Sequence, residues 1–526
     1  MATKKEHSAV SECRTKTEKG SRQYDTVIGL EVHIELSTAT KIFCGCSTKF
    51  GALPNTQTCP VCTGMPGSLP VLNKKVVEYA VALGLATNSR MNQRCLFDRK
   101  NYFYPDNPQN YQISQLYVPI CQDGFLTIEV KRDTAESKEE QNRANTGEEE
   151  DPCVGGEKSG ETKTAKNIRI HEMHMEEDAG KLTHDEEAGI SLVDYNRSGV
   201  PLIELVSEPD MESAEEVIAF LEKLRMICLY LGISDCKLQE GSMRADVNLS
   251  VKEAGSNALG TRTEMKNLNS FKAITRAIAA ERKRQIALLE SGRPVEQETR
   301  RWDDAAGVSY SMRSKEDSKD YRYFPEPDVP PVVISQEWIA QIKSRQPEFQ
   351  EEKAARFQTE YGIPAYDANI LTQSRQLAAL FEETARLSGQ PKKTANWFMG
   401  ELLRLLKEAG KEPEELSFSP QHAAALIAAV EAGKINQANA REVFAKVVEE
   451  NVEPLSYMEQ HGLRNLSDTR ALQAAVDEVL AEYAATAEEY RAGQVKVFGF
   501  LVGQVMKKTK GKADPGKVNE LLRKSL

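Results

Sequence analysis

Four of the ten cysteines lie within one short segment and have the spacing of metal ligands. They form a CxC pair and, after twelve intervening residues, a CxxC pair: Cys44, Cys46, Cys59 and Cys62. Two close pairs on short turns can converge as four thiolates on one tetrahedral ion, the arrangement that structural zinc prefers. Such a shell is closed, so the ion would stabilise a loop and activate no water. The spacing predicts a structural zinc loop over residues 44–62. The alternative is a loop of free or redox-active cysteines.

A second group of candidate ligands lies on a predicted β-strand. Between residues 24 and 36, apolar residues alternate with Glu31, His33 and Glu35, and alternation with period two marks a half-buried strand. The polar side chains would share one face, with successive ones about 6–7 Å apart. Carboxylates with an occasional imidazole suit a Mg²⁺ ion that clamps nucleotide phosphates. The plain alternative is a strand face turned to solvent.

Three further segments add acids and bases to these candidates. Residues 171–178 end a predicted strand in a dense group of carboxylates. Residues 244–248 and 262–267 put acidic and basic residues side by side on alternating strands. A lysine or arginine placed there could stabilise a transferring phosphoryl group. The polar residues together favour a site for Mg²⁺ and nucleotide phosphates.

The elements that must position these residues divide the chain into a mixed half and a helical half. Up to about residue 345, strand patterns alternate with helical ones such as 214–231 and 270–291, which predicts a large α+β domain. From residue 346 onward, apolar residues recur with helical spacing and strand signals vanish. The helical half is predicted to divide near Pro454 into a bundle and a small terminal domain.

Composition limits the class of protein and its surroundings. The chain has 526 residues and a net charge of -11, so it is not a generic basic nucleic-acid coat protein, although a local basic patch is enough to hold phosphates. No apolar run approaches the ~20 residues that cross a bilayer. The polar composition of residues 1–23 predicts a flexible extension without a secretory signal. The composition of residues 131–166 predicts a solvated acidic insertion. We expect a cytoplasmic protein that does not enter the membrane.

The ordered motifs also carry a family resemblance. They occupy residues 27–36, 66–73, 104–115, 174–181, 193–202 and 266–271. In this order they resemble the family of B subunits of the aspartyl/glutamyl-tRNA(Asn/Gln) amidotransferase, from about Tyr24 to the C-terminus. The N-terminal extension and the acidic insertion depart from the shorter family pattern, and neither interrupts a motif.

The resemblance implies a fold and a domain plan. The fold class is α+β: a large mixed α/β, cradle-like catalytic domain over residues 24–345, then an all-α helical domain over residues 346–455. A small all-α tail domain of the YqeY type follows over residues 456–526 and binds tRNA. The resemblance places the zinc loop and the acidic insertion inside the catalytic domain.

The resemblance also implies an ATP-dependent ligase with partner subunits. An amidase (A) subunit releases ammonia from glutamine, and a small C subunit holds the assembly together. The B subunit phosphorylates the side-chain carboxylate of misacylated Glu-tRNA(Gln) or Asp-tRNA(Asn) with ATP, and ammonia then displaces phosphate. A carboxylate is a poor acyl donor until its oxygen becomes a leaving group, and Mg²⁺ offsets the charge on phosphates and carboxylate.

The motif match assigns roles to residues of the catalytic domain. The Mg²⁺ ligands implied are Glu31, His33 and Glu177, and Glu176 is the next candidate. The acidic surround is completed by Asp246 and Glu264, and the candidate contacts to phosphate or acyl phosphate are Arg244 and Lys266.

The match also assigns contacts to tRNA. Aromatic faces stack on bases, so the terminal adenosine would be held by Tyr104, Asp106 and Tyr111; the alternative for each tyrosine is core packing. Four lysines near the C-terminus supply positive charge for tRNA phosphates, with a merely solvated face as the alternative: Lys507, Lys508, Lys510 and Lys512.

Two other functions fit parts of the sequence. A non-catalytic RNA-binding module would use the zinc loop and helical tail, but it has little use for clustered acids near RNA. A metal-dependent hydrolase without an RNA substrate would leave the helical extension and its lysines without a purpose. The ligase accounts for both features.

Overall fold

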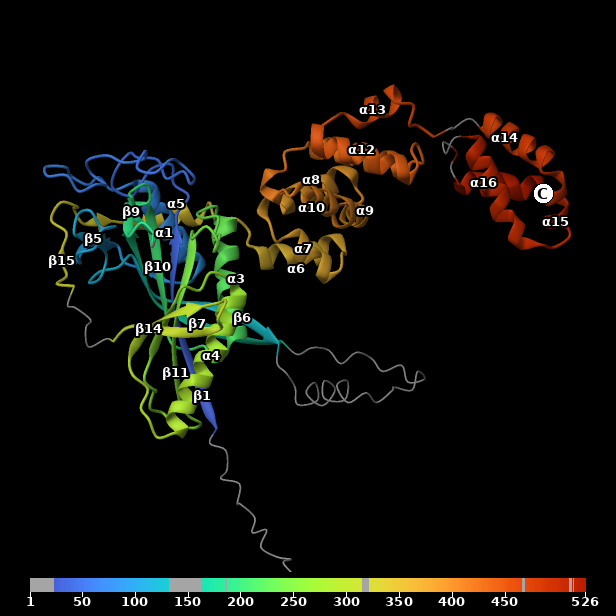
Figure 1. The fold of residues 1–526 in the computed structure, drawn as a ribbon. Helices are drawn as coiled ribbons and strands as arrows, with labels where there is room; N and C mark the ends of the chain where they lie inside the picture. Colours follow the sequence, from blue (N-terminus) through green and yellow to red (C-terminus); the bar gives the residue numbers. More distant parts are fainter. Residues whose placement is uncertain are drawn as a thin grey trace, which may run out of the picture. The chain divides into compact units, whose positions relative to one another are not determined.

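The computed structural model describes residues 23–131, 163–185, 187–314, 321–465, 469–509, 513 and 515–526 (Figure 1). Nearly all of the predicted N-terminal extension and acidic insertion falls on residues 1–22 and 132–162, outside this range. The chain divides into two compact units, of which the first ends at residue 346, next to the predicted end of the catalytic domain. The domain limits themselves stay a prediction.

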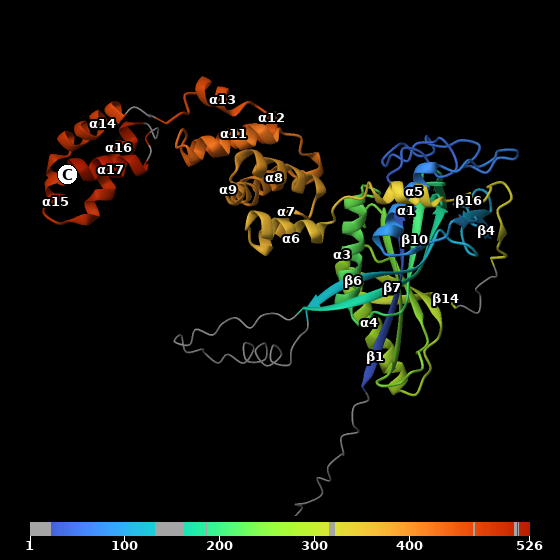
Figure 2. The same ribbon diagram turned by 180° about the vertical axis from the view of Figure 1, so that it is seen from behind.

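A nine-stranded sheet forms the centre of the first unit within the described part of the chain (Figures 1 and 2). The order is β14-β13-β12-β11-β1-β10-β7-β6-β2, with β12 and β13 parallel and the other neighbours antiparallel. The strands are β1 (Tyr24–Glu35), β2 (Arg90–Met91), β6 (Cys121–Lys131), β7 (Lys163–Glu177), β10 (Pro201–Ser207), β11 (Met243–Glu253), β12 (Thr263–Lys266), β13 (Glu298–Asp303) and β14 (Val308–Ser314).

The alternation in β1 separates a buried apolar face from a polar one. Leu30, Val32 and Ile34 are at most 1% exposed, whereas Glu31 and His33 between them are half-buried. Because successive side chains of a strand point to opposite faces, one face of β1 joins the core and the other carries the polar residues. The strand predicted from the sequence is therefore present with the predicted faces.

Three helices of the first unit contact this sheet: α1 (Lys74–Ala86), α3 (Ala214–Leu231) and α4 (Phe271–Glu290). A further helix, α5 (Gln336–Lys343), contacts α1. Helix α3 contacts β6 and α4 contacts β11, and the two helices also contact each other. Asn73, Ser213 and Ser270 begin α1, α3 and α4 by accepting a hydrogen bond from a backbone N–H of the first turn, which satisfies one of the groups that a helix start leaves open.

Short strands form smaller sheets in the first unit. They are β3 (Arg94–Cys95) with β16 (Val332–Val333), β4 (Asp98–Asn101) between β5 (Tyr111–Ser114) and β15 (Phe324–Pro325), and β8 (Lys181–Asp185) with β9 (Ile190–Asp194). Strand β5 contacts β7. The segment that contains Tyr111 therefore lies beside the strand that contains Glu176 and Glu177.

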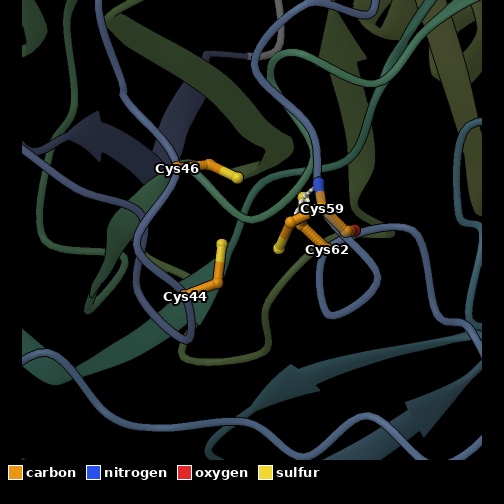
Figure 3. Close-up of side chains that lie close together, drawn as sticks. All are labelled: Cys44, Cys46, Cys59 and Cys62. Carbon is orange, nitrogen blue, oxygen red and sulfur yellow. Dashed lines mark hydrogen bonds between the residues drawn. The ribbon is translucent and has the colours of Figure 1, made fainter.

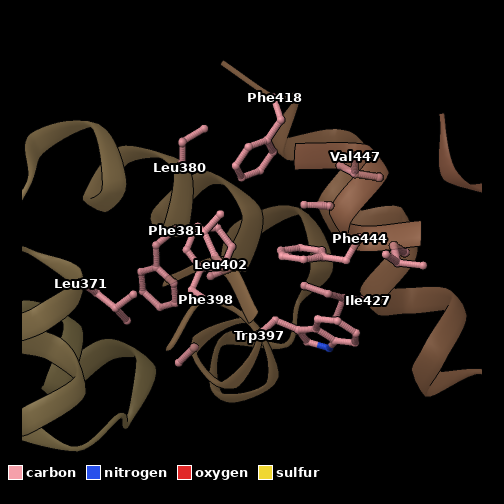
Figure 4. Close-up of a cluster of buried hydrophobic side chains, with 14 of the residues drawn as sticks. Leu371, Leu380, Phe381, Trp397, Phe398, Leu402, Phe418, Ile427, Phe444 and Val447 are labelled. Atoms are coloured by element: carbon pink, nitrogen blue, oxygen red, sulfur yellow. The ribbon is translucent and has the colours of Figure 1, made fainter. Parts of the chain in front are cut away.

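The second unit is helical in its described residues. Its first part contains α6 (Gln350–Tyr361), α7 (Ala365–Leu371), α8 (Arg375–Ser388), α9 (Pro391–Trp397), a π-helical turn η2 (Phe398–Leu402), α10 (Leu403–Ala409), α11 (Pro420–Glu431), α12 (Gln437–Glu450) and α13 (Pro454–Gln460). Figure 4 shows the aromatic centre of this bundle, where the rings of Trp397 and Phe444 lie 5.1 Å apart and those of Phe381 and Phe398 lie 5.8 Å apart.

The end of the chain has an apolar core of its own. Helices α14 (Thr469–Glu482), α15 (Ala484–Arg491), α16 (Phe498–Lys508) and α17 (Pro515–Ser525) make up this part. Its buried residues include Val476, Leu501 and Leu522, whereas Met458 belongs to the core of the preceding bundle. A mixed first unit and a helical second unit confirm the predicted fold class. No helix among the described residues combines the length and the apolar character needed to span a bilayer.

Candidate functional site

The four predicted zinc ligands converge in the loop that follows β1. The sulfur atoms of Cys44, Cys46, Cys59 and Cys62 all lie within 4.8 Å of one another, and Figure 3 shows the first pair facing the second. The backbone N–H of Cys59 donates to Sγ of Cys62 over 3.2 Å. The Cys44 thiol, which donates to Cys62, lowers the pKa of Cys62 to about 4 against the effect of burial. Four converging sulfurs fit a structural zinc ion.

A glycine closes this loop against a neighbouring segment. Gly64 has a φ of +66°, and a Cβ there would lie 2.8 Å from Cγ of Gln109 and 3.0 Å from its Cα. Only glycine takes this conformation without strain and leaves room for such a close approach. The turn after Cys62 therefore depends on Gly64. A side chain at this position would force the turn and Gln109 apart.

Sheet register places polar side chains in one row across four strands. His33 pairs with Arg244 on β11 and with Glu204 on β10, and Glu204 pairs with His174 on β7. Residues directly opposite each other in antiparallel strands point to the same face of the sheet. Sequence reasoning named His33 and Arg244 as candidate site residues, and His174 lies in the segment 171–178 that it singled out. It did not name Glu204, and it did not predict that these residues lie side by side, which follows from the sheet order.

The first acidic group surrounds Glu31. Carboxylate oxygens of Glu31, Asp246 and Glu264 lie within 4.8 Å of one another, and Lys266 Nζ lies 2.8 Å from Glu264 and also pairs with Asp246. Asn248 donates to Glu31 over 2.8 Å. Burial and the nearby Glu204 raise the pKa of Glu31. Three carboxylates and one ammonium leave excess negative charge, so the group suits a hard divalent cation.

The second acidic group lies between two histidines. Glu204 is 3.4 Å from Nε2 of His33 and 3.2 Å from Nε2 of His174, and Glu176 lies 3.9 Å from each imidazole. Burial alone would lower the pKa of His174, but Glu204 and Glu172 raise it to about 10. His174 and His33 in turn hold the pKa of Glu204 well below its ordinary value despite burial. His33, Glu176 and Glu204 have ligand atoms within 4.8 Å of one another.

Glu177 lies outside both groups. Its Oε1 accepts from the backbone N–H of Ile113 over 3.0 Å, on the strand β5 that contacts β7. Burial raises the pKa of Glu177 to about 8, although the Ile113 N–H opposes the shift. Neighbouring residues of a strand point to opposite faces. Glu176, two residues after His174, therefore lies on the same sheet face as His33, and the adjacent Glu177 does not.

Arg244 is held by an acid at the end of β7. Its guanidinium lies 2.9 Å from Asp178, and that of Arg197 lies 3.5 Å from the same carboxylate. Burial and Asp178 together raise the pKa of the neighbouring Glu35 to about 8. The structure thus brings Glu31, Asp246, Glu264 and Lys266 together, brings His33 and Glu176 together, and places Arg244 at the end of the row.

Comparisons with known proteins identify the family. The model of the GatB/GatE catalytic domain matches residues 26–340, and that of the GatB domain matches residues 379–526. The chain belongs to the GatB/GatE family. Two relatives are named as the B subunit of the aspartyl/glutamyl-tRNA(Asn/Gln) amidotransferase. The protein from Lachnospira eligens is 58% identical over 511 residues, and the match covers 96% of this chain and 100% of the relative. The protein from Caldicellulosiruptor saccharolyticus is 50% identical over 507 residues, and the match covers 96% of this chain and 99% of the relative. The resemblance seen in the motifs is confirmed.

The predicted adenosine contacts of this GatB/GatE member have different surroundings. The side chain of Tyr104 is 55% exposed, so core packing does not account for it. Tyr111 is half-buried, and the guanidinium of Arg99 lies 4.2 Å from the centre of its ring. The backbone carbonyl of Asp106 accepts from the N–H of Gly180 over 2.8 Å. Of the two tyrosines, Tyr104 has the more exposed side chain.

The predicted tRNA contacts fall on the helices at the end of the chain. Lys507 is exposed on α16. Lys508 lies 3.0 Å from Glu478 and 3.3 Å from Glu482. Lys510 and Lys512 lie outside the described residues. Of the two lysines that the structure describes, Lys507 is therefore the more available to a phosphate.

Two residues of the site were missed by sequence reasoning. Glu204 interrupts the apolar run of β10, and a lone carboxylate in a buried strand was a usable signal. Lys100 on β4 is half-buried, and burial alone would lower its pKa, but Glu176 and Tyr323 raise it. No spacing in the sequence connects Lys100 to the row, because the small β15-β4-β5 sheet brings it there.

Proposed function

We propose that this chain is the transamidating subunit of a tRNA-dependent amidotransferase. It converts misacylated Glu-tRNA(Gln), Asp-tRNA(Asn) or both into Gln-tRNA(Gln) and Asn-tRNA(Asn), with ATP as the phosphoryl donor. The observation that carries the proposal is the polar sheet face, where β1 contributes to two acidic groups. The first group also takes residues from β11 and β12, and the second from β7 and β10. A face of this kind suits phosphoryl transfer, in which positioning and charge neutralisation do most of the catalysis.

The residues of this face fit two divalent cations. Glu31, Asp246 and Glu264 would hold one Mg²⁺ ion, and His33, Glu176 and Glu204 would hold another. When bound, Mg²⁺ offsets negative charge on the phosphates and on the substrate carboxylate. The assignment of Glu177 by motif match, as a third ligand beside Glu31 and His33, has less support than these two groups, because Glu177 belongs to neither.

The reaction has two steps with defined bond changes. In the first, a side-chain carboxylate oxygen of the aminoacyl-tRNA attacks the γ-phosphorus of ATP, an O–P bond forms, and ADP leaves. In the second, ammonia attacks the activated carbonyl carbon, phosphate leaves, and the nitrogen loses a proton. Lys266, which contacts two carboxylates of the first group, and Arg244 are our candidates for the phosphate contacts.

Glu177 is our candidate for the proton transfer. A carboxyl group with a pKa of about 8 exchanges its proton near neutral pH, as a general acid or base must. Its Oε1 is fixed by the N–H of Ile113, which holds the carboxyl in one orientation. In its ionised form Glu177 would take up the proton that the new amide nitrogen releases.

The remaining roles concern substrate and partners. Tyr104, Asp106 and Tyr111 would hold the terminal adenosine of tRNA, and the lysines of the tail, Lys507 foremost, would contact its phosphates. Ammonia would come from an amidase (A) subunit that hydrolyses glutamine, with a small C subunit joining the assembly. The four cysteines would hold a structural zinc ion. We place the enzyme in the cytoplasm, where tRNA is charged.

An amidation assay with ammonia tests the proposal. The three-subunit complex is supplied with Glu-tRNA(Gln) or Asp-tRNA(Asn), ATP, Mg²⁺ and ammonium chloride, which bypasses the amidase. The wild type should form amidated tRNA only when ATP is present, and Asp246→Asn should lose this activity while it retains tRNA binding. Asp25→Asn, exposed at the start of β1, is the matched control and should keep full activity. Binding of tRNA without any amidation would favour the RNA-binding module.

A further inference from the structure

Lys41 is a fully buried lysine beside the cysteine loop. Its side chain is 0% exposed, and lysines are almost never buried completely unless they are paired. Its Nζ lies 3.5 Å from Sγ of Cys62 and 3.2 Å from the backbone carbonyl oxygen of Tyr195. Its backbone N–H donates to the carbonyl of Cys46 over 2.9 Å. Lys41 is therefore connected to both cysteine pairs of the loop.

The charge of Lys41 needs an anion, and the sulfur of Cys62 is the group in contact that can supply one. The Tyr195 carbonyl satisfies a hydrogen bond but carries no net charge. Four thiolates around one divalent zinc ion leave an excess of negative charge, which is most costly at Cys62, the buried member of the four. An ammonium group that donates to one thiolate reduces this excess and orients the ligand, as partners of metal ligands commonly do.

The same lysine lies close to Glu177, the carboxyl group proposed for the proton transfer. A Cβ placed on Gly199 would be 3.5 Å from Cδ of Lys41, 3.5 Å from Cβ of Cys62 and 3.9 Å from Oε2 of Glu177. Gly199 has a φ of +81°, and its carbonyl accepts from the N–H of Ile42 over 3.0 Å. Lys41, Cys62, Gly199 and Glu177 also line one cavity of about 190 Å³. The lysine stem, a zinc ligand and the reactive carboxyl thus meet around one glycine.

We propose that Lys41 is a positioning residue, whose buried ammonium neutralises the zinc thiolates through Cys62 and fixes the cysteine loop beside Glu177. The proposal rests on the structural zinc ion proposed above. It assigns no contact with substrate to Lys41. Loss of the ammonium should loosen the zinc ion and displace the wall of the cavity that Glu177 shares with Cys62.

The test compares metal binding in three variants of the full chain. Lys41→Met keeps the length of the stem and removes the charge and the donor. Lys41→Gln keeps an N–H donor without the charge, and it provides the same comparison if the methionine variant does not fold. Lys49→Met, which replaces an exposed lysine of the same loop, is the matched control. Zinc loss to an excess of a chelator and the spectrum of the Co²⁺-substituted protein are measured for each.

The proposal predicts an order among the variants in both measurements. Lys41→Met should lose zinc at least about tenfold faster than the wild type, within the range known for partners of metal ligands, and Lys41→Gln should lie between them. Removal of a donor raises the energy of the sulfur lone pairs, so the thiolate-to-Co²⁺ charge-transfer band should move to longer wavelength in the same order. Lys49→Met should match the wild type in both measurements.

Two outcomes would contradict the proposal, one by removing the zinc ion and the other by removing the role of Lys41. If the wild type retains no stoichiometric zinc and binds no Co²⁺ at the cysteines, both the zinc ion and the role of Lys41 are wrong. If the wild type binds the metal and Lys41→Met matches Lys49→Met in zinc loss and in the Co²⁺ spectrum, the zinc ion stands and the role of Lys41 is wrong. Either result leaves the amidation assay, and with it the proposed reaction, to be judged separately.

Discussion

The sharpest perturbation of the proposed site is Glu204→Gln. Glu204 lies 3.4 Å from His33 and 3.2 Å from His174, and its side chain is 13% exposed. The substitution keeps the shape of the side chain and removes one negative charge. His174 then loses the largest influence that raises its pKa, and the second acidic group loses a carboxylate that a cation would bind.

The size of the effect follows from the role proposed for Glu204. Replacing a residue that only supports the ligands of a metal ion typically lowers metal affinity about 10–100-fold, and Glu204 would itself be a ligand. We therefore expect the half-saturating concentration of free Mg²⁺ to rise about a hundredfold, at the upper end of this range.

The assay is ammonia-supported amidation by the assembled complex, titrated with free Mg²⁺ at saturating tRNA and ATP. Glu208→Gln is the matched control, because Glu208 also pairs with a histidine, His171, over 3.0 Å, but on the exposed surface. The control should stay within about twofold of the wild type, since exposed pairs contribute little. A half-saturating Mg²⁺ concentration for Glu204→Gln that equals that of the control would refute the assignment of Glu204 to a cation site.

Three further variants test stability, pH dependence and tRNA binding. Phe444→Ala removes a fully buried ring and should destabilise the helical unit by about 3–5 kcal/mol; a denaturation midpoint no lower than that of Phe500→Ala, at a ring 46% exposed, would contradict this. Burial raises the pKa of Glu177 to about 8, so its contribution to stability, present below the ordinary carboxyl pKa, is lost as pH rises toward 8. The free energy of unfolding, measured with urea at acidic and at alkaline pH, should therefore fall less with rising pH in Glu177→Gln than in the wild type. An equal fall in the two proteins would argue against a buried carboxyl with a raised pKa. Lys507→Glu should lower tRNA affinity and reduce the slope of its salt dependence by about 1; an unchanged slope would mean that Lys507 faces solvent only.

Local patterns in the sequence were sufficient where the site depends on neighbours in the chain. The cysteine spacing indicated the convergence of Cys44 and Cys62 because both pairs lie on one loop. The alternation from residue 24 to 36 identified the polar face of β1 and the positions of Glu31 and His33, because the two faces of a strand are fixed by its geometry.

Other parts of the site depend on strand order and register, which no spacing within one segment contains. Glu204 reaches His33 because β10 lies next to β1, and Lys100 reaches Glu176 through a separate small sheet. Glu176 and Glu177 are adjacent in the sequence, and the pleat of β7 sends them to different surroundings. The partner of Arg244, Asp178, was equally hidden, since the two residues lie on different elements and meet only after folding.

The most direct test of the central claim is the release of phosphate from ATP in the absence of any ammonia source. If this chain activates the carboxylate by phosphorylation, Glu-tRNA(Gln) or Asp-tRNA(Asn) should stimulate phosphate release by the complex even when no amide can form. Correctly charged Gln-tRNA(Gln) should not stimulate it, because its side chain offers no carboxylate, and Asp246→Asn should abolish the stimulation. Phosphate release that is the same with misacylated tRNA, with Gln-tRNA(Gln) and without tRNA would contradict the account.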